Sequence, residues 1–116
     1  MAPALRLLPS ILCALVMAAH AMRSGWGPVA VAALALSPLA FLVRRPLVPW
    51  AARILLLAGS LEWLRTARAY SLERAALGQP SARLWAILGS VAAFHLVAAA
   101  LLSGSRVRAW FRPPAA

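Results

Sequence analysis

The 116-residue chain contains no lysine, aspartate or asparagine, and its only acidic residues are Glu62 and Glu73. Its single cysteine, Cys13, excludes an intrachain disulfide, a CxxC redox pair and a thiolate cluster for a metal. The sequence also lacks a serine–histidine–acid set, a glycine-rich phosphate loop and a metal-ligand spacing. We therefore expect a protein that is not an enzyme and that binds no metal and no cofactor.

Long apolar runs dominate what is present. Hydrophobic residues make up 64% of the chain and charged residues 12%, far from the averages of soluble domains. The apolar runs cover residues 5–22, 26–43, 50–70 and 84–103, and a bilayer core about 30 Å thick needs about 20 helical residues to cross it. The pattern predicts an all-α membrane protein, an antiparallel four-helix transmembrane bundle forming one domain over residues 1–116. The bias toward alanine, leucine and arginine favours a bacterial inner membrane.

The first apolar run has a second interpretation. Arg6, a short apolar stretch and Ala19-His20-Ala21 resemble a signal peptide with a small-x-small cleavage site. Removal of residues 1–21 would leave three spans. Because Pro9 interrupts the stretch early and another hydrophobic run follows almost directly, we expect the segment to be retained as the first span.

Proline and glycine mark the predicted connections. Pro28 fits the first turn of a helix, while residues 44–46 and 78–81 are short Pro-containing turns that imply antiparallel neighbours. Pro38 is expected to bend the second span and to free a backbone carbonyl that then needs another partner.

The formal net charge of +10 comes from arginines at the span ends and in the spacers. This placement favours anionic lipid headgroups as the counter-charge and argues against nucleic acid. Four of the five tryptophans also flank predicted spans, as expected at membrane interfaces. The arginines assigned to the side of the termini are Arg6, Arg44, Arg45, Arg53, Arg106, Arg108 and Arg112, and those on the opposite side are Arg23, Arg65, Arg68, Arg74 and Arg83. Seven arginines lie on the side of the termini and five on the other side. Because cytoplasmic segments carry the excess of positive charge, we expect both termini to be cytoplasmic.

The third run is the least pure, and it allows two interpretations. In one, the membrane portion ends near Leu64 and residues 65–77 form an amphipathic extension on the membrane surface. In the other, Trp50 and Tyr70 bracket a full crossing of about 30 Å. Glu62 then lies roughly 18 Å from the level of Trp50.

A polar cluster follows from the second interpretation. His95, ten residues after Trp85, is roughly 15 Å from the opposite face and therefore close in depth to Glu62. Arg65 is one turn from Glu62, so Glu62, Arg65 and His95 form a candidate intramembrane cluster. Such groups either mark an ion path or fix helix packing. The depths of His20 and His95 should differ by roughly 10 Å, too far for two axial ligands of one haem.

Gly89 and Ala93 give the fourth span a small face suited to helix packing. Small loops and the absence of a catalytic set favour a non-catalytic accessory or assembly subunit of a larger membrane complex. The alternative is a small homo-oligomeric transporter using Glu62 with Arg65 or His95. In size and span number the chain resembles the small multidrug-resistance exporters, but the glutamate which that family has in its first span is missing here. We expect the partners to be the lipid bilayer and other membrane subunits or further copies of the chain.

Overall fold

The computed structural model describes residues 2–112, which are helical apart from short turns. Five α-helices and one 3-10 helix follow one another in this part of the chain: α1 (Pro3–Arg23), α2 (Pro28–Leu36), η1 (Ser37–Leu42), α3 (Leu47–Ala76), α4 (Ala82–Leu101) and α5 (Ser105–Trp110). Of these, α1, α3 and α4 are long and apolar enough to cross a membrane. The prediction of an all-helical protein with membrane-spanning helices is therefore supported for three of the four apolar runs.

The second apolar run differs from its prediction. Instead of one span over residues 26–43, it forms α2 and then η1, which together cover the 15 residues Pro28–Leu42. Pro38 has no N–H with which to bond the carbonyl of Leu34, so the α-helix ends at Leu36. The backbone N–H and the Oγ of Ser37 donate to that carbonyl instead, the latter at 2.7 Å. The break at Pro38 is thus stabilised locally, and we call Pro28–Leu42 the short arm.

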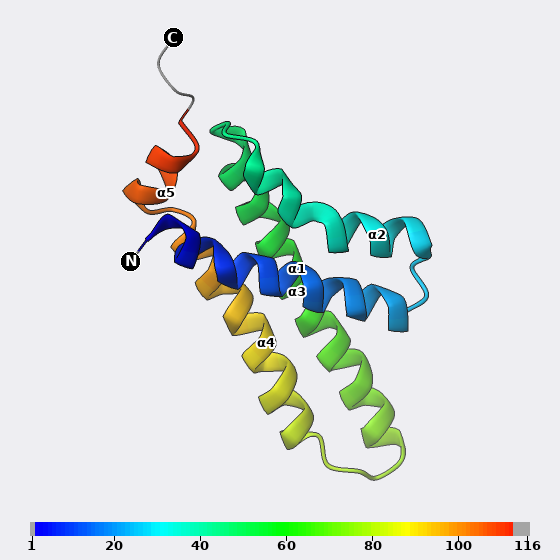
Figure 1. Cartoon of the computed structure of the whole chain (residues 1–116). Helices are drawn as coiled ribbons and strands as arrows, with labels where there is room; N and C mark the ends of the chain where they lie inside the picture. The colour runs from blue at the N-terminus through cyan, green and yellow to red at the C-terminus, as the bar shows by residue number, and fades with distance from the viewer. Residues whose placement is uncertain (1, 113–116) are drawn as a thin grey trace.

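The helices form two hairpins that cross obliquely (Figure 1). The first consists of α1 and the short arm, joined by a turn in which Gly25 and Gly27 have positive φ. The second consists of α3 and α4, which run antiparallel and are joined through Gly78, also at positive φ. Helix α3 continues without a break to Ala76, so the predicted extension over residues 65–77 is part of the same helix.

One end of the molecule gathers the start of α1, the connection before α3 and the C-terminal helix α5. The rings of Phe41 and Phe111 are 5.9 Å apart, and the guanidinium of Arg44 lies 4.2 Å from the centre of the Trp110 ring. Leu102, Val107 and Phe111 are among the most deeply buried side chains. This common end confirms that the N-terminal segment, the second spacer and the C-terminal segment lie together. Helix α5 was not predicted.

The seam between α3 and α4 is built around Gly59, Ser60 and His95. Ser60 Oγ donates to the carbonyl of Ala92 at 3.1 Å, and the His95 ring packs over Gly59. Ala93 is exposed, and among the described residues nothing lies within 4 Å of a Cβ added at Gly89. Gly89 and Ala93 are therefore not the face that meets α3, because the fit of the His95 ring over Gly59 sets the rotation of α4.

Candidate functional site

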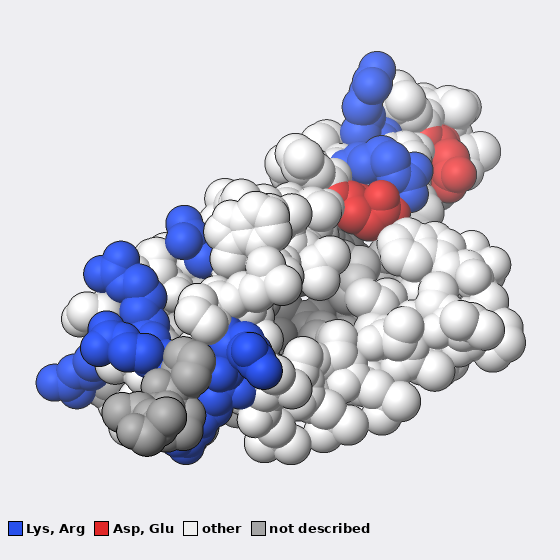
Figure 2. All heavy atoms as spheres, turned by 90° about the horizontal axis from the view of Figure 1, so that it is seen from above, with Lys and Arg blue, Asp and Glu red and all other residues white. Residues whose placement is uncertain are grey.

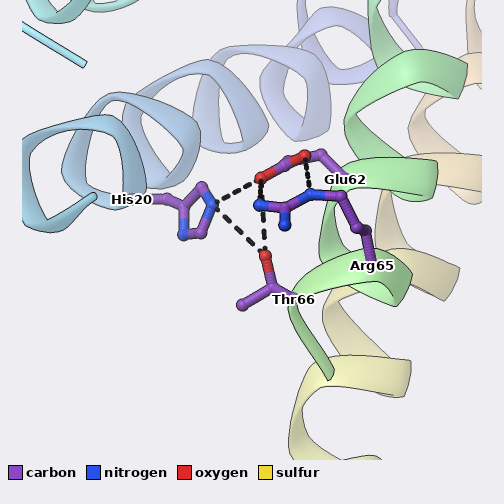
Figure 3. Close-up of polar contacts among 4 residues, drawn as sticks. All are labelled: His20, Glu62, Arg65 and Thr66. Atoms are coloured by element: carbon purple, nitrogen blue, oxygen red, sulfur yellow. Dashed lines mark hydrogen bonds and ion pairs between the residues drawn. The ribbon is translucent and has the colours of Figure 1, made fainter. Parts of the chain in front are cut away.

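A polar cluster links α1 to the middle of α3 (Figure 3). Arg65 binds Glu62 through two bonds, Nε to Oε2 at 2.8 Å and Nη2 to Oε1 at 2.6 Å. His20 Nε2 lies 3.1 Å from the same Oε1. Thr66 Oγ1 lies 3.5 Å from Glu62 Oε1 and 3.4 Å from His20 Nε2. One carboxylate therefore holds two cationic or potentially cationic side chains and a hydroxyl.

Local helix geometry explains how three of these residues meet. Glu62, Arg65 and Thr66 occupy positions i, i+3 and i+4 of α3, which face the same side of a helix. The fourth, His20, lies three residues before the end of α1 at Arg23. The cluster therefore sits where the end of one helix reaches the middle of another.

The cluster is buried on one side and open on the other. The side chains of His20 and Glu62 are 7% and 18% exposed, whereas that of Arg65 is 64% exposed. Thr66 is buried. Bidentate arginine–carboxylate pairing is the strong form of such a contact, and here it anchors Glu62 so that its remaining oxygen lone pairs can hold His20. The arrangement is well suited to fixing α1 against α3.

The structure brings together two of the three residues of the predicted cluster. Glu62 and Arg65 pair as expected, but His95 does not take part: its Nδ1 lies 2.9 Å from the carbonyl of Val91, one turn earlier in α4. The ring of Trp63 is 4.5 Å from that of His20 and 6.4 Å from that of His95. The predicted pairing of Glu62 with His95 is therefore wrong, because the side of α3 that meets α4 carries Trp63 and Glu62 faces α1.

His20 is the partner that the sequence-based reasoning missed. Its position could have been found from the spacing of Ser10, Cys13, Met17 and His20, which places all four on one face of a helix. All four are buried in the structure. Trp63, the one tryptophan that does not flank a predicted span, is also buried and contacts the rings of both histidines.

Charge is distributed unequally along the molecule. Figure 2 shows both acidic residues beside arginines at one end and a larger group of arginines, with no acid among them, toward the other. The second group belongs to the common end, where Arg6 and Arg44 lie against α5 and the turn before it. In residues 2–112 no three histidine, cysteine or acidic side chains lie close enough to hold a metal ion.

No family model, curated protein or solved structure matches this chain. Its function has to be inferred from the chemistry and packing of its own residues.

Proposed function

We propose that this protein is a multi-pass protein of the bacterial inner membrane that serves as a non-catalytic accessory or assembly subunit of a larger membrane complex. The short arm is the observation that carries this proposal. Its 15 residues, α-helical and then 3-10, extend about 25 Å, less than the thickness of a bilayer core.

Exposing apolar side chains to lipid costs little free energy. The exposure of the short arm alone therefore does not indicate a protein partner. Its broken backbone is more informative. Irregular backbone at membrane depth is tolerated where protein covers it or where it lines a water-filled cavity. Ser37 satisfies the carbonyl of Leu34 at the break, but no residue within Pro28–Leu42 is buried. We propose that helices of another subunit cover the exposed side of this irregular segment.

The path of the chain supports a fourth crossing by the short arm. Both α1 and α3 begin at the common end, so the segment between them must return to that end. We propose an antiparallel four-span topology in which neighbouring subunits shield the short arm. The arginine-rich common end then faces the cytoplasm and its anionic lipid headgroups.

Site-specific photo-crosslinking in the native membrane tests this function. A benzoylphenylalanine placed at the exposed Leu39 of the short arm should give one adduct of constant mass with a larger membrane protein. The matched control is Val97 of α4, which is also exposed and should contact lipid alone. Recovery of an isolated homodimer in mild detergent, with self-adducts at Leu39, would contradict the subunit role.

A homo-oligomeric transporter that uses Glu62 is the second proposal, favoured by the position of this carboxylate midway along α3. It is less well supported because Glu62 is already engaged by Arg65 and His20. If the transporter proposal is correct, the wild-type chain should carry proton-linked flux in liposomes and Glu62→Gln should abolish it. The absence of flux in the wild-type chain, or equal flux in the two proteins, rejects the proposal.

A further inference from the structure

A cavity of about 450 Å³ lies between α1, the short arm and α3, with His95 of α4 in its wall. The molecular surface is hollowed near its middle in Figure 2. The volume falls in the range of pockets that hold small organic ligands, about 300 to 1,000 Å³. Most of the wall is aliphatic, from residues such as Leu34, Leu55 and Leu56, so the cavity suits an apolar molecule.

Two buried polar groups in the wall have no partner. His95 is 2% exposed and Ser10 is 4% exposed. Within residues 2–112 no group forms a hydrogen bond with His95 Nε2 or with Ser10 Oγ. Ser37, which also lines the cavity, differs because its hydroxyl is bonded to the carbonyl of Leu34. Buried polar atoms are nearly always satisfied, by protein or by ordered water.

The hydrogen bond at Nδ1 of His95 determines whether its Nε2 needs a donor or an acceptor. A carbonyl only accepts, so the contact with Val91 requires Nδ1 of His95 to carry the hydrogen. In the neutral ring Nε2 is then an acceptor and requires a donor. Ser10 can supply a hydrogen to an acceptor on the same ligand. A hydrocarbon chain would fill the space but would satisfy neither group.

We propose that this cavity binds an apolar alcohol or phenol whose hydroxyl donates to His95 Nε2, with Ser10 as a second polar group in the same wall. The site is separate from the His20–Glu62 cluster. Ser37 and Pro38 of the short arm line it, whereas Leu39, the position chosen for crosslinking to a partner, does not. The site does not depend on the subunit role proposed above, and failure of either proposal leaves the other standing.

Photolabelling of the purified full chain in phosphatidylcholine nanodiscs tests the site. The probes are a diazirine-bearing long-chain alcohol, a diazirine-bearing alkyl phenol and the methyl ether of each, which lacks the donor hydrogen. We expect at least one hydroxyl probe to label the cavity segments 33–56 about fivefold more than its ether. The hydroxyl probe that labels more strongly shows whether the site prefers an aliphatic alcohol or a phenol.

Variants connect the labelling to the two polar groups. His95→Phe keeps a ring but removes the acceptor, and should bring the ratio of hydroxyl probe to ether close to one. Ser10→Ala should lower the labelling by both probes, because the ether oxygen can also accept from Ser10. Ser71→Ala is the control, because the hydroxyl of Ser71 is bonded to Arg68 outside the cavity. Competition on the wild-type chain, by unlabelled dodecanol against dodecane, gives a readout that needs no variant. Equal labelling by hydroxyl and ether probes, no labelling, or a preference unaffected by His95→Phe would overturn the proposal.

Discussion

The two hairpins are built from similarly apolar sequence, yet they are packed very differently. In the α3–α4 hairpin, both helices are long enough to span a bilayer, and they meet along a seam where His95 packs on Gly59. In the other hairpin only α1 is long enough, and its partner, the short arm, has no buried residue within Pro28–Leu42. The comparison shows that sequences of similar hydrophobicity can be buried to very different extents in the same fold.

Helix α1 packs against both the short arm and the other hairpin. Its buried residues include Cys13, which belongs to the same apolar cluster as Leu56 of α3 and Ala98 of α4, and His20, which binds Glu62 of α3. With α3 and α4, helix α1 forms a buried three-helix unit, and on its other side it packs against the short arm, whose residues are all at least partly exposed.

The largest expected effect is at the seam of this three-helix unit. A Cβ added at Gly59 would lie 2.9 Å from His95 Cδ2 and 3.1 Å from Met17 Cε, so a larger residue must displace α4, α1 or both. We expect Gly59→Leu to lower the free energy of unfolding by about 3 kcal/mol, measured by titration with sodium dodecyl sulfate in mixed micelles. Gly89→Leu is the matched control in the same hairpin and should change stability little, because among the described residues nothing lies within 4 Å of its Cβ position. Equal losses in the two variants would show that the seam is elsewhere.

The contact between the hairpins should have an intermediate effect. Glu62→Gln removes the charge that holds both Arg65 and His20, and we expect it to cost about 1.5 kcal/mol. A double-mutant cycle with His20→Phe should give a coupling energy of about 0.6 kcal/mol or more, the typical size of a polar contact between membrane helices. Glu73→Gln, at the exposed second acid of α3, should be neutral in the same assay. A coupling energy of zero would mean that His20 and Glu62 do not hold α1 on α3.

Hydrophobic length and turn residues were enough to predict most of the helices, but not how they cross. The fourth run was expected at residues 84–103 and forms Ala82–Leu101. This helix begins just after Pro80 and ends just before Ser103 and Gly104. Glu62 lies close to the level of His95, since His95 contacts Gly59 and Trp63 of α3, but residue depth does not show which side of α3 faces α4. Helix α1 crosses α3 obliquely (Figure 1), so His20, near its end, reaches the middle of α3. Crossing angles depend on how side chains fit between helices, which residue spacing along one helix does not contain.

The smallest expected effect concerns the break that distinguishes the short arm from the other helices. Pro38→Ala restores an N–H that can bond the carbonyl of Leu34, so the α-helix should continue through residues 37–42 and the arm should become a regular helix. In the wild-type chain Ser37→Ala removes the side-chain donor to that carbonyl and should cost about 1 kcal/mol. In the Pro38→Ala background the same change should cost almost nothing, because the backbone then satisfies Leu34. The double-mutant cycle, followed by unfolding in mixed micelles and by amide hydrogen exchange at residues 37–42, measures this difference. If Ser37→Ala costs the same in both backgrounds, the hydroxyl does not compensate for the proline, and the short arm owes its break to packing against α1 or α3 instead.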